Sequence, residues 1–172
     1  RILRRDIDVL GGYTRSFTIY DSADSERVMK NILKDLDMDE KTFPPKYVLA
    51  AISKEKDKQV SPRQMRAEAE ESGNLKAKYI SGAYEKYQAQ LRENNALDFD
   101  DIICLTVELL QKHEDVRRYY QQKFRYLLVD EYQDTNHMQY LLTALLAGGR
   151  ENICVVGDDD QSIYRFRGAT IE

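Results

Sequence analysis

The sequence predicts an α/β protein that is predominantly helical, with an all-helical part followed by a unit that contains a parallel sheet. Two observations predict this class. Apolar residues at helical spacing dominate roughly the first 120 residues. Near the C-terminus, the short apolar runs Tyr126–Val129 and Ile153–Val156 flank one helix-like segment. Strands joined by a crossover helix pair in parallel, and continuous apolar runs predict that both strands are buried.

Amino-acid composition narrows the possible kinds of protein further. Of the 172 residues, 42% are hydrophobic and 33% are charged, which is typical of a folded chain. The net charge of −4 excludes a generally basic protein that coats duplex DNA, so any DNA contact must be local. No run reaches the ~18 apolar residues that span a membrane. Cys104 and Cys154 lie in apolar runs, which predicts buried free thiols in a reducing cytoplasm and no zinc site.

The first predicted helices are separated by clear stops. Residues 2–10 have helical spacing, and Gly11-Gly12 ends this helix. Phe17–Tyr20 is β-branched and aromatic, which predicts a short strand or an extended loop. Ser22 is expected to cap the next helix. That helix carries the apolar stripe Val28, Met29, Ile32, Leu33 and Leu36.

The middle of the chain predicts three further helices. Pro44-Pro45 precedes a helix that runs through Ile52, and Ser53–Val60 is expected to be a charged surface loop. Ser61–Gln64 combines a cap, a first-turn proline and a capping-box glutamine, and Leu75–Leu91 forms a long helix. Basic residues around the loop either touch duplex phosphates or, as the interspersed acids favour, form a plain solvated surface. These are Lys54, Lys56, Lys58, Arg63 and Arg66.

The last helices precede and separate the two strands. Asp98 is expected to cap a helix that runs through Leu109, and a short helix with Val116 and Tyr120 follows. A further helix covers about residues 136–147 and ends at Gly148-Gly149.

Acidic side chains directly follow the first predicted strand. Within Leu127–Asp134, Asp130 and Glu131 lie at the carboxyl edge of the sheet, where parallel sheets bind ligands. In nucleotide hydrolases, one acid there holds Mg²⁺ and a neighbour takes a proton from the attacking water. We assign the first role to Asp130 and the second to Glu131. The alternative, a solvated acidic turn, is disfavoured by the adjacent strand and by a second motif.

That second motif, Gly157–Ala169, follows the second strand. Gly157 lets the backbone turn tightly off the strand, and Gln161 is suited to sensing a terminal phosphate. The tip interleaves rings with guanidinium groups, which stack on bases and pair with phosphates. Alone, this tip is equally well explained as a basic amphipathic turn that packs against a neighbouring domain. Its members are Tyr164, Arg165, Phe166 and Arg167.

Two motifs are specific in combination. The first is Asp-Glu-Tyr-Gln-Asp-Thr-Asn at residues 130–136, and the second is Gly-Asp-Asp-Asp-Gln-Ser-Ile-Tyr-Arg-Phe-Arg-Gly-Ala at residues 157–169. They resemble motifs II and III of superfamily 1 helicases of the UvrD/PcrA/Rep family. Residues 96–102 resemble that family's Leu-Asp-Phe-Asp-Asp signature, and residues 17–21 are similar to the start of its helical insertion. The resemblance spans nearly the whole chain.

The resemblance implies an ATP-dependent DNA helicase that moves 3′ to 5′ in DNA repair or replication. ATP and Mg²⁺ would be its cofactors, and single-stranded DNA, forked DNA and repair proteins its partners. Asp130 would coordinate Mg²⁺, Glu131 would be the general base and Gln161 would contact the γ-phosphate. Phe166 stands where the family usually has Trp, so we expect weaker stacking. Single-stranded DNA would be contacted by Tyr164, Arg165, Phe166 and Arg167.

The resemblance also implies two domains. Residues 1–95 would form the helical insertion domain 1B, and residues 96–172 would form part of the RecA-like domain 1A, a P-loop NTPase sheet. None of the 8 glycines begins a phosphate-binding loop, and both chain ends are expected to be boundaries within a longer protein. We therefore expect these residues alone to hydrolyse ATP at no useful rate. We also expect exposed strand edges that favour self-association.

Two other functions remain open. A non-catalytic helical module that binds duplex DNA or a repair protein would need only the first domain. The motor part of a helicase-nuclease subunit would carry the same motifs. The helicase hypothesis requires Asp130 and Glu131 to share one crevice with Gln161.

Overall fold

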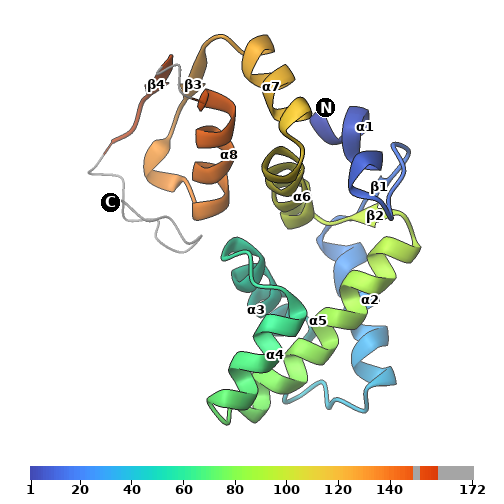
Figure 1. Cartoon of the computed structure of the whole chain (residues 1–172). Coiled ribbons are helices and arrows are strands. Elements are labelled where there is room, and N and C mark those ends of the chain that lie inside the picture. The colour runs from blue at the N-terminus through green and yellow to red at the C-terminus, as the bar shows by residue number, and fades with distance from the viewer. Residues whose placement is uncertain (149–151, 159–172) are drawn as a thin grey trace. The chain divides into compact units, whose positions relative to one another are not determined.

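A computed structural model describes residues 1–148 and 152–158, and the chain divides into two compact units. The first unit comprises Leu3–Ile102 with Arg1, and the second comprises Ile103–Glu172 with Ile2. Figure 1 shows the elements in chain order. In the described residues, no helix is both long and apolar enough to cross a membrane.

The elements are mostly helices, as the sequence predicts. They are α1 (Ile2–Asp6), the 3₁₀ helix η1 (Ile7–Leu10), β1 (Thr18–Ile19), α2 (Ser22–Asp35), α3 (Pro45–Asp57), α4 (Pro62–Glu71), α5 (Leu75–Glu93), β2 (Ala96–Leu97), α6 (Phe99–Lys112), α7 (Glu114–Lys123), β3 (Leu127–Val129), the 3₁₀ helix η2 (Tyr132–Asp134), α8 (His137–Ala147) and β4 (Ile153–Val155).

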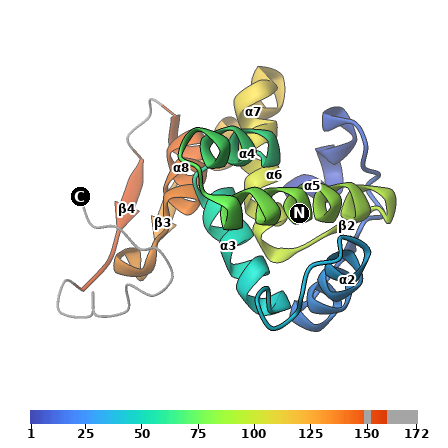
Figure 2. The same ribbon diagram turned by 90° about the horizontal axis from the view of Figure 1, so that it is seen from below.

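The core of the first unit lies among α2, α3, α4 and α5. Helices α4 and α5 run side by side in both views (Figures 1 and 2), and α2 packs against α3 and α5. The predicted apolar stripes supply this core because helical spacing brings them onto one face of each helix. Its largest fully buried members include Met29, Leu33, Val48, Ile52, Tyr87 and Leu91.

Helix caps confirm one prediction and correct another. Ser61 and Gln64 form the predicted capping box at the start of α4. For α2, however, the cap is Asp21 rather than Ser22. The Asp24 N–H donates to Asp21 Oδ1 over 2.8 Å, and Asp24 Oδ2 accepts from the Asp21 N–H. An aspartate one residue earlier provides the stronger acceptor for the N–H groups that the first turn leaves unpaired.

A small parallel sheet interrupts the helices of the first unit, so the expectation of an all-helical first part was wrong in this respect. Strand β1 confirms the short strand predicted in Phe17–Tyr20, and it pairs in parallel with β2. Both strands lead directly into a helix with an Asp-x-x-Asp capping box. Asp21 and Asp24 begin α2, whereas Asp98 and Asp101 begin α6. Because the strands are parallel, both helices start from the same end of the sheet.

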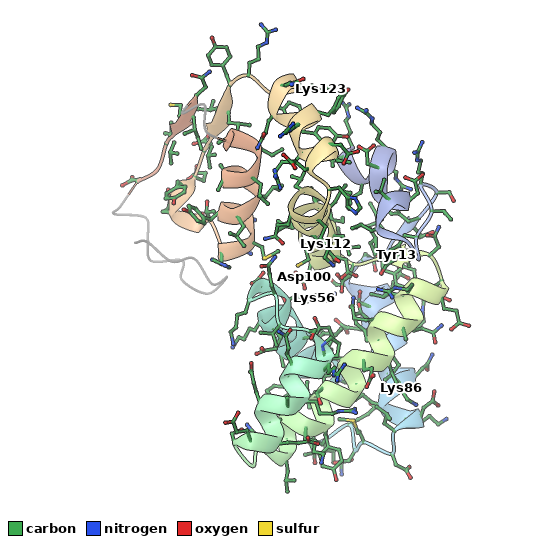
Figure 3. All side chains as sticks on the ribbon, in the orientation of Figure 1. Tyr13, Lys56, Lys86, Asp100, Lys112 and Lys123 are labelled. Atoms are coloured by element: carbon green, nitrogen blue, oxygen red, sulfur yellow. The ribbon has the colours of Figure 1, made fainter. Side chains whose placement is uncertain are left out.

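Lys56 is buried, which corrects the prediction of a surface loop at Ser53–Val60. Helix α3 continues through Asp57, and Lys56 is only 3% exposed. Its Nζ donates to Asp98 Oδ2 over 2.7 Å and to Asp101 Oδ1 over 2.8 Å. Figure 3 labels Lys56 and also Asp100, a carboxyl group on which Lys56 acts electrostatically. Lys56 therefore serves an internal ion cluster and not a phosphate-binding surface.

Burial and charge act in opposite directions within this cluster. Burial alone lowers the pKa of Lys56, but the carboxylates of Asp101 and Asp98 outweigh it and raise that pKa above its ordinary value. Burial raises the pKa of Asp101 to about 6, with Asp98 adding to the rise and Lys56 opposing it. One ammonium thus serves two carboxylates, and Lys56 stays protonated at neutral pH.

The second unit contains the predicted strand–helix–strand unit. Strands β3 and β4 pair in parallel, with Leu127 opposite Ile153 and Val129 opposite Val155, which confirms the predicted pairing. Helix α7 packs on α8, where the Gln121 side chain donates to the Leu145 carbonyl over 2.8 Å.

The strands of the second unit are more exposed than predicted. Leu128 is 72% exposed, and every residue of β4 is exposed, including Cys154. Cys104 is only partly buried, so the prediction of two buried thiols was wrong. The reason is that, in the part of the chain that the structure describes, this sheet has only two strands, too few to enclose their own apolar side chains.

Candidate nucleotide site

The carboxyl ends of β3 and β4 meet at one edge of the sheet. The Val156 N–H donates to the Val129 carbonyl over 2.8 Å, and the Tyr132 N–H donates to the Val156 carbonyl over 3.0 Å. These bonds hold the turn after β3 against the segment that leaves β4. Asp130 and Glu131 therefore lie at the carboxyl edge of the sheet, as their sequence position predicts.

Glu131 has a left-handed backbone conformation, with φ 52° and ψ 43°. This region is uncommon for residues other than glycine, and such strain concentrates at functional sites. The Glu131 N–H donates to Asp130 Oδ1 over 2.9 Å, and both acids are exposed. The turn thus presents two neighbouring carboxylates to solvent in a fixed backbone geometry.

Gln133 connects the two strand ends, a role that the sequence analysis missed. Its side chain is buried, with the residue only 5% exposed. Its Nε2 donates to Glu131 Oε2 over 2.5 Å, and its Oε1 accepts from the Asp158 N–H over 3.0 Å. An amide carries both a donor and an acceptor, so it can join a carboxylate on one turn to a backbone N–H on the other.

Gly157 is required for close approach rather than for an unusual backbone angle. The sequence predicts a tight turn, but Gly157 is not among the residues with positive φ. A Cβ at this position would lie 3.0 Å from Gln133 Oε1 and 3.3 Å from the Cβ of Tyr132. A side chain here would require the Gln133 amide, which bridges the strand ends, to shift by a few tenths of an ångström.

We expect Gln133→Leu to loosen the junction between the strand ends. Leucine has a similar size but cannot accept a hydrogen bond from the Asp158 N–H. A net hydrogen bond contributes about 0.5–1.5 kcal/mol, so amide hydrogen exchange at Asp158 should accelerate roughly three- to tenfold. Exchange measured by NMR checks this. Gln122→Leu, at an exposed position of α7, is the control. Unchanged exchange at Asp158 would show that Gln133 does not hold the junction.

The donor set at this edge suits a magnesium ion. The Asp130 carboxylate is a hard oxygen ligand, and Mg²⁺ is commonly held by one or two carboxylates together with water and phosphate oxygens. Oδ1 of Asp130 is oriented by the Glu131 N–H, which fixes the carboxylate at the strand end. In such a site water and phosphate oxygens supply the other ligands, and within residues 1–148 and 152–158 no group of three or more His, Cys, Asp or Glu side chains could hold a metal ion.

The remaining predicted site residues lie outside the described residues. The predicted closeness of Gln161 to Asp130 and Glu131 therefore stays a prediction. The same holds for the predicted DNA contacts of Tyr164, Arg165, Phe166 and Arg167.

The acid pair lies at the carboxyl edge of a parallel sheet, the edge at which α/β proteins commonly bind ligands. Comparison with known families is more specific. The model of the UvrD/REP helicase N-terminal domain matches residues 1–172, so the chain belongs to this family.

Named relatives agree with this membership. The chain is 46% identical over 171 residues to the ATP-dependent DNA helicase PcrA of Bacillus subtilis, covering 99% of the chain and 23% of that protein. It is 44% identical over 178 residues to the ATP-dependent DNA helicase UvrD1 of Mycobacterium tuberculosis, with 99% and 23% covered. For PcrA of Staphylococcus aureus the identity is 46% over 172 residues, with 100% and 23% covered. The chain thus spans less than a quarter of each relative.

Proposed function

We propose that the whole protein containing this chain is an ATP-dependent DNA helicase, and that the chain supplies its magnesium, hydrolysis and DNA-coupling motifs. The observation that carries the proposal is the acid pair Asp130-Glu131 at the carboxyl end of β3, joined to the end of β4 through Gln133. Membership of the UvrD/REP helicase N-terminal domain family supports it.

In the proposed mechanism, Asp130 and Glu131 divide the work of hydrolysis. Asp130 would hold Mg²⁺, which when bound neutralises charge on the phosphates. Glu131 would accept the proton of the attacking water. The hydrogen bond from Gln133 fixes one carboxylate oxygen of Glu131, so the same carboxylate can present its other oxygen to water. The left-handed backbone at Glu131 keeps this carboxylate at the strand end.

The second motif, Gly157–Ala169, would couple ATP hydrolysis to DNA. Gln161 would contact the γ-phosphate, and the tip formed by Tyr164, Arg165, Phe166 and Arg167 would contact single-stranded DNA. Gln133 ties the backbone at Asp158, three residues before Gln161, to the proposed general base. A change at the phosphate sensed by Gln161 would therefore be linked to the proposed general base through Asp158 and Gln133.

The proposed domains are a helical insertion at residues 1–95 and part of a RecA-like motor domain at residues 96–172. The exposed apolar side chains of β3 and β4 support the second assignment, since strands this apolar belong to sheets covered on both faces. As a helicase of this family, the whole protein would be cytoplasmic and would move 3′ to 5′ on forked DNA in repair or replication.

The experiment is an unwinding and hydrolysis assay on the whole protein. We expect DNA-stimulated, Mg²⁺-dependent ATP hydrolysis, and we expect duplexes with a 3′ single-stranded tail to unwind at least about ten times faster than duplexes with a 5′ tail. Asp130→Asn should lower both activities about a hundredfold or more, because the loss of a preorganised charge at a phosphoryl-transfer site costs on this order.

Asp115→Asn is the matched control, since Asp115 is an exposed acid in the first turn of α7. It should leave both activities within about twofold, as surface substitutions generally do. Binding of forked DNA without ATP-driven unwinding would reject the motor and favour a non-catalytic binding module. Faster unwinding of 5′-tailed duplexes would reject the proposed direction.

A further inference from the structure

A buried ion cluster fixes the first turn of α6. All four carboxylate oxygens of Asp98 and Asp101 accept hydrogen bonds. Asp98 Oδ1 accepts from the Asp101 N–H, and Asp98 Oδ2 accepts from Lys56 and from the Tyr87 hydroxyl. Asp101 Oδ1 accepts from Lys56 and Gln88, and Asp101 Oδ2 accepts from the Asp98 N–H. Rotation or sliding of this turn would break several of these bonds at once.

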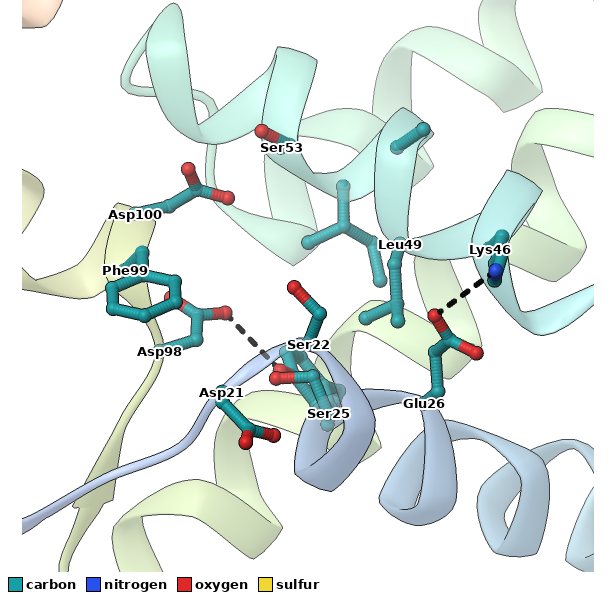
Figure 4. A pocket seen from close by; sticks show the side chains of 13 residues that line it. Asp21, Ser22, Ser25, Glu26, Lys46, Leu49, Ser53, Asp98, Phe99 and Asp100 are labelled. Carbon is teal, nitrogen blue, oxygen red and sulfur yellow. Dashed lines mark hydrogen bonds and ion pairs between the residues drawn. The ribbon is translucent and has the colours of Figure 1, made fainter.

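One side of this turn is open, although Asp98 and Asp101 themselves are buried. Phe99, the first residue of α6, is 59% exposed. A cavity of about 310 Å³ lies between the starts of α2 and α6 and the helix α3, and Figure 4 shows Ser22, Ser53, Asp98 and Phe99 around it. On the buried side, the polar contacts to Lys56 therefore supply the interactions that hold the turn.

The composition of the cluster indicates a role in geometry more than in stability. Replacing a buried ion pair by apolar residues of similar size is often neutral or stabilising. Here one ammonium is shared by two carboxylates, which leaves a buried excess of negative charge. The Oε1 atom of Gln88 is also buried without a hydrogen-bond partner in the described part of the chain. Such costs are consistent with a cluster that specifies one arrangement.

Helix α6 contains residues of both compact units. Its first turn, Phe99–Ile102, belongs to the first unit, and Ile103–Lys112 belongs to the unit that carries Asp130 and Glu131. A helix of 14 residues is about 21 Å long and, with its backbone bonds intact, transmits displacement along its axis. Contacts that fix this first turn therefore act on a helix that continues from the first unit into the second.

We propose that Lys56 is a positioning residue that holds the start of α6 on α3 and α5, so that motion of the second compact unit is passed to the first and drives strand separation. This inference rests on the proposed helicase function. Lys56 would not touch ATP or DNA, so its loss should uncouple unwinding from hydrolysis rather than stop hydrolysis.

The test measures base pairs unwound per ATP hydrolysed by the whole protein. With Lys56→Met we expect DNA-stimulated hydrolysis per folded molecule to stay within about twofold, whereas base pairs unwound per ATP should fall at least about fivefold, as positioning defects outside the chemical site can do. The triple variant Lys56→Met/Asp98→Asn/Asp101→Asn removes all buried charge from the cluster. This triple variant should show the same uncoupling even if the single variant does not fold.

Lys86→Met, at an exposed position of α5, is the matched control and should keep the wild-type ratio. A merely structural role would lower hydrolysis and unwinding together and leave their ratio unchanged, and that result would overturn the inference alone. If the wild-type protein showed no ATP-driven unwinding, the proposed function would fail and this inference with it.

Discussion

Glu131→Gln is expected to lower the rate of DNA-stimulated ATP hydrolysis by the whole protein about 10²- to 10⁴-fold, the range for loss of a general base. Glutamine keeps the size of the side chain but accepts no proton from the attacking water. It can still accept a hydrogen bond from Gln133, so the turn between the strand ends should stay intact. The measurement is kcat at saturating ATP, Mg²⁺ and single-stranded DNA.

Binding separates a chemical defect from a folding defect in this variant. The affinities of Glu131→Gln for ATP and for DNA should stay within about threefold of wild type, because the proposed base acts only on the attacking water. Glu114→Gln is the control, since Glu114 is an exposed acid that pairs with Arg118 on the surface of α7. A Glu131→Gln protein with more than about a tenth of the wild-type rate would show that another group takes the proton.

Local pattern was sufficient to predict most of the helices and one parallel strand pairing. Helical spacing predicted the helices of the first unit, and apolar runs around one helix predicted the parallel pairing of β3 and β4. The burial of these strands was not predictable in the same way. An apolar strand shows that a sheet could be covered, but the degree of cover depends on which other strands and helices are present.

The role of Lys56 could not be read from its neighbours in the sequence. Glu55 and Asp57 flank it and suggest a solvated surface, but its partners Asp98 and Asp101 lie 42 and 45 residues away. Tertiary packing brings these groups together, because α5 packs on both α3 and β2, the strand directly before Asp98. The cap at Asp98, by contrast, was predictable because its partner lies three residues along the same helix.

The same distinction applies to the candidate site. Asp130 and Glu131 were found because acids directly after an apolar strand have a local signature. Gln133 was missed because its second contact, with Asp158, spans 25 residues and depends on the register of two strands. A buried amide between two acidic turns is therefore a feature that tertiary structure, and not spacing, reveals.

Lys56→Met is expected to lower the free energy of unfolding of the 172-residue chain by about 3–5 kcal/mol, the usual cost of removing one partner from a buried ion pair. Asp98 and Asp101 would remain close together and almost fully buried, with no cation between them. The loss is large beside the roughly 5–15 kcal/mol that stabilises a typical domain. Urea unfolding followed by circular dichroism at 222 nm measures it.

Charge rather than size should account for this loss. The triple variant Lys56→Met/Asp98→Asn/Asp101→Asn removes the stranded charges, so it should recover at least about half of the lost free energy. Lys86→Met exchanges the same side chains at an exposed position and should change stability by no more than about 0.5 kcal/mol. If the single and triple variants were equally unstable, packing of the lysine side chain would explain the effect. In that case the shared ammonium would contribute nothing specific to the cluster.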